Sequence, residues 1–243
     1  MDERLKNIVE NLDSMKIGLD EIFKFHCKMC GNCCINREDI LLSPKDIYNM
    51  SKELGLATTD FFHKYCEGFV GPDSRVPIVR LKPHRADRRC PLLKNMKCRV
   101  HRAKPTVCAM FPIGRAVAAE DMKEGLKNIS QDQVQYLFTN PGCGDDSETH
   151  TVREWLESFG IPVQDEFFLK WQQTVLDMGN IFRTIERGMS RNVMEQIWNV
   201  VFAGVYLSYD LEQEFLPQFE DNTKKFFELM DSAFSLGGDS PIR

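Results

Sequence analysis

Residues 27–34, Cys-Lys-Met-Cys-Gly-Asn-Cys-Cys, place four cysteines within eight positions. Two residues between successive cysteines allow a tight turn to direct several thiolates at one ion. Gly31 follows the second cysteine and can adopt a positive φ without a side-chain clash. Because Cys33 and Cys34 are adjacent, their side chains diverge in an extended backbone. Either one of them is structural or the chain has two metal sites.

The chain has nine cysteines in all, and eight of them lie between Cys27 and Cys108. Cys66 shares the apolar face of an expected helix with Phe62 and Phe69, so we interpret it as a buried thiol. The other eight are enough for two sites of four thiolates each. The predicted metal ligands are Cys27, Cys30, Cys33, Cys34, Cys90, Cys98, Cys108 and Cys143.

All-thiolate ligation suits both zinc and iron–sulfur clusters. Zinc sites usually contain two Cys-x-x-Cys pairs, whereas here one dense triplet is combined with scattered cysteines. Three cysteines at this spacing match the first part of the bacterial ferredoxin pattern, whose fourth cysteine precedes a proline, as Cys90 precedes Pro91. The pattern favours a [4Fe–4S] cluster, with zinc as the alternative.

The same residues resemble the YkgJ-like family, a zinc- or iron-chelating cysteine-cluster domain, over about residues 25–145. The resemblance rests on the Cys27–Cys34 segment, on Cys90-Pro91-Leu92-Leu93, on Cys98-Arg99-Val100-His101 and on Lys104–Pro112, and the later Cys143-Gly144 resembles a further family cysteine. His101 departs from the usual tyrosine, and Lys104 and Ala109 depart from the usual arginines. The resemblance implies metal binding, and a related flagellin lysine methylase carries a similar cluster.

Charge is concentrated around three of the predicted ligands, although the net charge is only −5. Residues 75–115 contain twelve Lys or Arg and one acid, Asp87. These cations either offset the negative charge of a thiolate cluster or bind nucleic acid or an acidic partner. Phe111 is the only aromatic residue in this stretch, and single-strand binding usually needs more. We therefore favour charge compensation over binding of nucleic acid or an acidic partner by this stretch. For the protein as a whole, a redox or protein partner is a more plausible expectation than nucleic acid.

The remaining pattern predicts an α+β protein, mostly α, with a small cysteine-rich core of short strands and a C-terminal helical layer. Ser43-Pro44 and Gly55 are typical of the start and end of a helix, and Thr58 or Thr59 could cap the next one. Strands are expected at residues 40–42, 76–81 and 112–119, and Asp145, Asp146 and Glu148 are expected in a turn that caps a helix near Thr151. The expected parts are residues 1–24, an amphipathic helix; residues 25–149, the cysteine-cluster domain; and residues 150–243, the helical region.

The N-terminal helix is expected because Leu5, Ile8, Leu12, Met15, Leu19 and Ile22 recur every three or four residues. Its apolar stripe either lies against the protein's own body or forms a homodimer through a coiled coil. The first residues do not have the composition of a secretory signal, and no apolar stretch approaches the roughly 20 residues of a membrane span. With an odd number of cysteines, this predicts a cytoplasmic protein without membrane partners.

Three classes of function fit these features. The first is a metal-cluster protein that acts in electron transfer or metal handling. The second is an iron–sulfur-dependent protein-modifying enzyme resembling the methylase, and the third is a structural-zinc adaptor. No catalytic residue is predicted, because the sequence contains no nucleotide-binding or metalloprotease motif, and His26 and His101 are interpreted as neighbours of the metal ligands.

Overall fold

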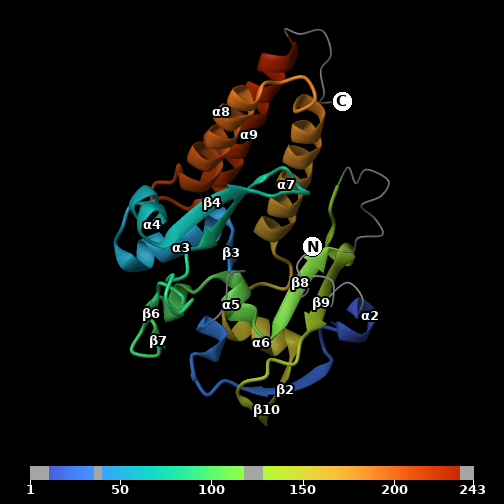
Figure 1. The fold of residues 1–243 in the computed structure, drawn as a ribbon. Helices are drawn as coiled ribbons and strands as arrows, with labels where there is room; N and C mark the ends of the chain where they lie inside the picture. The colour runs from blue at the N-terminus through green and yellow to red at the C-terminus, as the bar shows by residue number, and fades with distance from the viewer. Residues whose placement is uncertain (1–10, 36–39, 118–127, 236–243) are drawn as a thin grey trace. The chain divides into compact units, whose positions relative to one another are not determined.

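The computed structural model describes residues 11–35, 40–117 and 128–235, and it confirms an α+β protein that is mostly α (Figure 1). Contacts divide the chain into two compact units, each built from two separate stretches of sequence. Unit 1 comprises residues 1–33 and 106–172, and unit 2 comprises residues 34–105 and 173–243. The boundary therefore falls between the adjacent Cys33 and Cys34. Within the described ranges, no helix combines the length and the apolar character needed to cross a bilayer.

Unit 1 contains two small antiparallel sheets, one with strand order β1-β9-β8 and one that pairs β10 with β2. The strands are β1 (Lys16–Ile17), β2 (Ile22–His26), β8 (Ile113–Val117), β9 (Val134–Phe138) and β10 (Asp145–Thr151). The helical segments are α2 (Leu12–Met15), η4 (Gln131–Gln133), α5 (Thr106–Met110), α6 (Val152–Ser158) and the first turns of α7 (Glu166–Ile185). The short η1 (Asn32–Cys34) crosses the unit boundary.

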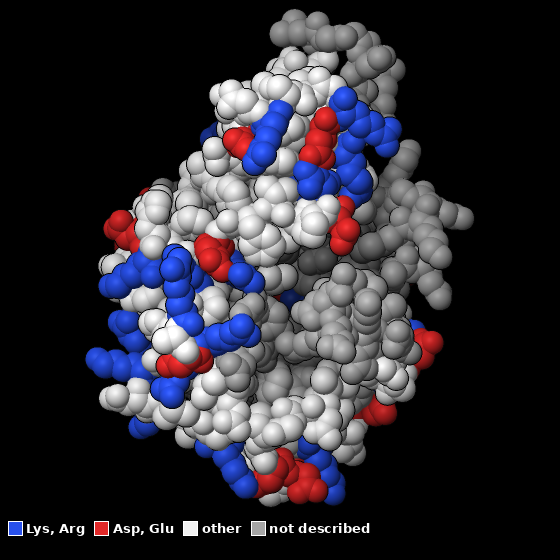
Figure 2. Space-filling view, viewed as in Figure 1, with Lys and Arg blue, Asp and Glu red and all other residues white. Residues whose placement is uncertain are grey.

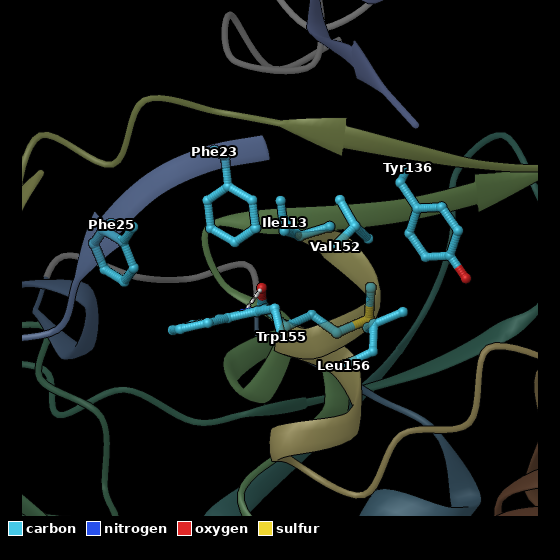
Figure 3. Close-up of a cluster of buried hydrophobic side chains, with 8 residues drawn as sticks. Phe23, Phe25, Ile113, Tyr136, Val152, Trp155 and Leu156 are labelled. Atoms are coloured by element: carbon cyan, nitrogen blue, oxygen red, sulfur yellow. Dashed lines mark hydrogen bonds between the residues drawn. The ribbon is translucent and has the colours of Figure 1, made fainter. Parts of the chain in front are cut away.

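An aromatic core holds β2 in place. Phe23 and Phe25 are only 4% and 3% exposed, so alternate residues of β2 point into the unit. Trp155 on α6 meets both rings edge-on at centroid distances of 5.8 Å, as Figure 3 shows. Its indole N–H donates a hydrogen bond of 2.9 Å to the carbonyl of Met110. Because Phe25 is buried two residues before Cys27, this core fixes where the cysteine loop begins.

Unit 2 contains a sheet with strand order β3-β5-β4, a β6–β7 hairpin and most of the long helices. The strands are β3 (Leu41–Leu42), β4 (Cys66–Val70), β5 (Pro77–Leu81), β6 (Leu93–Lys94) and β7 (Lys97–Cys98). The helical segments are α3 (Pro44–Leu54), α4 (Thr58–Tyr65), η2 (His101–Ala103), the rest of α7, α8 (Arg191–Val201), the π-helical η5 (Phe202–Leu207) and α9 (Phe215–Ser235).

The ends of α3 are those that the sequence predicts. The Ser43 hydroxyl accepts the Asp46 N–H and the Asp46 carboxylate accepts the Ser43 N–H, so each satisfies a backbone donor at the helix start. Gly55 ends the helix at φ 62°, a conformation that costs glycine little. The expected strands at residues 40–42 and 76–81 are confirmed by β3 and β5. The strand expected at residues 112–119 is confirmed by β8 as far as Val117, and residues 118 and 119 lie outside the described residues.

Buried hydroxyl groups tie η5 and the segment after it to the rest of unit 2. Tyr206 donates a hydrogen bond to the carbonyl of Pro77, and Thr58 donates one to the carbonyl of Leu207. Gly68 on β4 lies so close to Phe202 that an added Cβ would be 2.7 Å from its ring. These contacts hold the C-terminal helices of unit 2 against its sheet.

The helix predicted through Ile22 is wrong for the part that the structure describes. Residues 1–10 lie outside the described residues, and the helix that follows ends at Met15. Lys16 and Ile17 pair with β9, and Ile22 begins β2. The spacing of three and four residues was misleading. The residues that are buried here are Phe23 and Phe25, which do not belong to that stripe and alternate as the residues of a strand do. No helical seam therefore runs from Met15 to Ile22.

The predictions around α4 and β10 also need correction. Thr58 is the first residue of α4 and its hydroxyl bonds elsewhere, so the cap position falls to Ala57 without a side-chain bond. The burial of Cys66 is confirmed, but this residue begins β4 instead of continuing the helix. Asp145, Asp146 and Glu148 lie in β10, and Asp145 is paired with His26 of β2. Only Thr151 caps α6.

Candidate metal centre

The loop after β2 has the backbone turns that a multi-thiolate site needs. Met29 and Gly31 both have positive φ, 51° and 75°, on either side of Cys30. The chain therefore turns sharply before and after this cysteine, and the short η1 then turns it again at Cys33. Cys27 and Cys30 are exposed and Cys33 is half-buried. The predicted positive φ at Gly31 is confirmed.

Strand pairing brings Cys143 to this loop. β10 runs antiparallel to β2 with Asp145 opposite His26. Cys143 precedes Asp145 by two residues and Cys27 follows His26 by one, so the two cysteines continue neighbouring strands. Gly144, which lies between Cys143 and Asp145, has φ 74°, and a Cβ added to it would overlap the carbonyl oxygen of His26. Only glycine allows the two backbones to approach so closely.

The thiols of unit 1 interact with one another. Cys143 and Cys30 share a hydrogen bond, and burial raises the pKa of the Cys143 thiol. The charges of Cys30, Cys33 and Cys27 raise this pKa further. Four thiolates in one place repel one another, and a bound cation removes that repulsion. The donor set therefore fits a thiophilic metal or an iron–sulfur cluster.

Among residues 11–35, 40–117 and 128–235, no three Cys, His, Asp or Glu side chains surround one point closely enough to hold an ion in this conformation. The unit 1 thiols thus lie near one another, but they are not arranged as a complete coordination sphere. Cys27 and Cys30 are exposed, so rotation of their side chains is unhindered.

An ion-pair network that the sequence did not reveal borders these thiols. Lys28 pairs with Asp145 at 2.6 Å, and the Ser147 hydroxyl donates a hydrogen bond of 2.6 Å to the same carboxylate. These contacts hold the pKa of Asp145 well below its usual range. His26 lies 3.4 Å from Asp145 and 3.6 Å from Glu148. The network fixes the edge of the cysteine loop to β10, and the hydrogen bond and charge of Asp145 raise the pKa of Lys28.

Three other predicted ligands lie near one another in unit 2. The Cys90 N–H donates a hydrogen bond of 2.8 Å to the carbonyl of Cys34, and the backbone bridge between Ile35 and Arg89 extends this contact. Cys98 on β7 is opposite Leu93, whose N–H bonds to the carbonyl of Cys90. The adjacent Cys33 and Cys34 thus belong to different groups of cysteines.

The last two cysteines differ in their surroundings. Cys108 is half-buried on α5 of unit 1, and its role as a ligand stays a prediction. Cys66 is buried on β4 of unit 2, and burial strongly raises the pKa of its thiol. A thiol so hard to ionise is a poor metal ligand. All nine cysteines are described, and none forms a disulfide.

A hollow of about 690 Å³ adjoins Cys143 in unit 1. Its wall is formed by β2, by residues 14–17 and by the Phe138–Asp146 stretch. Its lining includes Lys16, Glu21 and Lys24, so both charges are present. The volume is that of a typical small-molecule site.

Replacing Gly144 with alanine should weaken metal binding although every cysteine is kept. The new Cβ meets the His26 carbonyl and lies 2.8 Å from the Phe25 ring, in a backbone conformation that alanine disfavours. We expect a loss of about 2–4 kcal/mol in the free energy of unfolding and a reduced metal content. Metal analysis and urea unfolding measure the two effects.

Gly142→Ala is the matched control for this change. Gly142 has φ 60°, but nothing lies within 4 Å of its added Cβ. This variant should cost about 1–2 kcal/mol from the backbone conformation alone and keep its metal. Equal metal contents in the two variants would contradict the role given to the β2–β10 approach.

Comparison with known protein families finds a match over the stretch of chain that contains most of the candidate metal ligands. Residues 26–136 match the family model described as "CxxCxxCC: Putative zinc- or iron-chelating domain". The match contains every candidate ligand except Cys143, which lies beyond its end. Neither the curated proteins nor the solved structures contain a match to this chain.

Proposed function

Because residues 26–136 form a domain of the CxxCxxCC family, which is the YkgJ-like family that the sequence resembles, we propose that this metal-binding protein holds a [4Fe–4S] cluster and uses it in electron transfer. The proposed ligands are Cys27, Cys30, Cys33 and Cys143. The observation that carries the proposal is the pairing of Asp145 with His26, which brings a fourth thiol to the triplet. When bound, such a cluster supplies reversible one-electron transfer.

The composition of the donor set supports iron–sulfur over zinc. Three thiols come from one loop with ferredoxin-like spacing, and the fourth comes from a distant part of the chain. The backbone turns at Met29 and Gly31 are of the kind that direct amide groups toward cluster sulfurs.

Cys34, Cys90 and Cys98 supply three thiols for a second site in unit 2. Their support is the Cys90–Cys34 backbone bond and the Cys98–Leu93 pairing. Cys108 stays a candidate ligand without an assigned site. The predicted set of eight cysteines is kept in full in this proposal.

Anaerobic purification followed by iron, zinc and acid-labile sulfide analysis tests the proposal. We expect a brown protein with broad visible absorption and with iron and sulfide in equal amounts. Cys143→Ser should lose cluster, whereas Cys66→Ala, which removes a thiol that the proposal leaves unused, should keep it. A colourless protein with stoichiometric, redox-silent zinc would refute the cluster and support the structural-zinc adaptor.

The hollow beside Cys143 favours a second candidate, an iron–sulfur-dependent protein-modifying enzyme. An electron carrier needs no such space, whereas a modifying enzyme needs room for a cofactor or a side chain next to the cluster. Calorimetric titration with S-adenosylmethionine separates the two functions. Saturable binding that Ile22→Trp at the hollow weakens would support the enzyme, and absence of binding would leave the electron carrier.

A further inference from the structure

Unit 2 carries a group of exposed cations around the β6–β7 hairpin. Figure 2 shows Lys and Arg gathered over and beside this hairpin, with few acids among them. We define the basic hairpin surface by five exposed residues of this region: Lys82, Arg85, Lys94, Lys97 and Arg102. The protein as a whole is acidic, so this surface has the opposite sign to the net charge.

The cations next to the basic hairpin surface already have partners. Among the described residues, the five residues of the surface itself are not paired with any acidic side chain. Arg80 pairs with Glu67 at 2.7 Å, and Arg89 pairs with Asp87 at 3.1 Å. Arg99 donates a hydrogen bond of 2.9 Å to the hydroxyl of Tyr65. The acids nearby are thus used by cations outside the basic hairpin surface. The positive charge of the five remains available to a partner.

The hairpin presents these charges on a defined backbone. Lys94 and Lys97 are opposite each other, and the two turn residues Asn95 and Met96 have φ 51° and 59°. Two positive φ values are typical of the tight turn that matches strand twist. Met96 at the tip is 41% exposed, so a soft apolar side chain stands between two lysines.

The hairpin is framed by two predicted metal ligands. Cys90 precedes β6, and Cys98 ends β7 two residues after Met96. Two residues of extended chain span at most about 7 Å. A protein bound at the tip would therefore lie close to Cys98.

We propose that the basic hairpin surface is the docking site of an acidic electron-carrier protein. The proposal rests on the proposed function for the choice of an electron carrier, but the binding itself depends only on charge and shape. An exposed apolar centre within a charged rim has the composition of a protein interface. Complementary charge would steer the carrier to the surface.

The chemistry of the surface favours a protein over nucleic acid. Residues 82–105 contain no Phe, Tyr or Trp, the rings that usually stack on the bases of single-stranded nucleic acid, and His84 and His101 are the aromatic side chains there. Met96 instead offers a flexible apolar contact of the kind that protein partners bury. Nucleic acid binding is accordingly an outcome of the test and not part of the proposal.

Calorimetric titration of the full protein with a flavodoxin that has an acidic face tests the proposal. We expect saturable binding at low ionic strength that weakens steeply as salt is added. Lys94→Gln/Lys97→Gln should weaken it roughly three- to thirtyfold. Lys224→Gln/Lys225→Gln removes the same charge from exposed sites on α9, where each lysine pairs with an acid one turn away, and should bind like the unchanged protein.

Several results would overturn the proposal. One is flavodoxin binding that is equal in the two variants, or absent at low salt. Another is binding of single-stranded or duplex DNA that is tighter than flavodoxin binding and is lost with the hairpin lysines. Iron and sulfide analysis of the same samples keeps the two proposals apart. Binding without a cluster would refute the proposed function alone, and a cluster without binding would refute the docking site alone.

Discussion

Cys30→Ser should lose metal and solubility together. Cys30 is exposed, so its thiol contributes little to packing and its removal should be nearly neutral in the absence of metal. With metal, the same change removes a ligand whose binding energy is part of the folding energy. Structural zinc sites contribute about 10–16 kcal/mol, so losing one of four ligands should cost several kcal/mol. The soluble fraction of the expressed variant measures the loss of solubility, and metal analysis and urea unfolding of the purified variant measure the losses of metal and of stability.

Urea unfolding measured with and without a chelator shows whether the lost metal is the cause of the lost stability. After chelation, the Cys30→Ser protein and the unchanged protein should unfold at similar urea concentrations, because only the metal distinguishes them. Cys66→Ala should show the reverse pattern, with full metal content and a packing loss of roughly 1 kcal/mol in both conditions. A Cys30→Ser protein with full metal content would contradict the ligand assignment.

Asp165→Asn should destabilise unit 1 by about 3–5 kcal/mol. Asp165 pairs with Arg115 on β8 at 2.9 Å, and their side chains are 9% and 5% exposed. The guanidinium also lies 3.8 Å from the centroid of the Phe168 ring. Its Nη1 already has no hydrogen-bond partner among the described residues. Removal of the carboxylate that pairs with it within the described part of the chain would leave a buried, uncompensated cation.

The choice of asparagine and a second variant make the test specific. Asp165 also accepts the backbone N–H of Phe168 at the start of α7, and asparagine keeps that bond. Arg115→Met/Asp165→Asn removes both charges and should regain most of the lost stability. Urea unfolding followed by circular dichroism measures both variants. If the double variant is as unstable as the single one, the unpaired cation is not the cause.

Local signals in the sequence were sufficient where a few neighbouring residues decide the conformation. Ser43, Pro44 and Gly55 specify both ends of α3, and Gly31 specifies a turn within the cysteine loop. Cys66 is apolar in context, and its burial follows. For α3 and for Gly31 the deciding interactions lie within one turn of helix or one loop, so no distant part of the chain is needed. Cys66 lies instead on β4, where it is paired with Leu81 of β5.

The N-terminal stripe and the acidic residues of β10 show where such signals fail. Strand pairing between β2 and β10 joins residues more than 100 positions apart, and no local pattern encodes it. The pairing of β1 with β9 overrides helical spacing at Lys16 and Ile17, and the pairing of β10 with β2 converts a predicted turn at Asp145 into strand. The network of Lys28, His26 and Asp145 follows from this pairing, so the sequence could not reveal it.

The sequence by itself determined that this protein binds metal, which cysteines are candidates and that Cys66 is not one of them, because residue chemistry and short spacings carry that information. Only the tertiary structure decided how those cysteines are grouped. It associates Cys143 with the Cys27–Cys33 loop and associates Cys34 with Cys90 and Cys98. The physical reason is that thiols far apart in sequence meet only through backbone hydrogen bonds between distant segments, and those bonds form only when the whole unit packs.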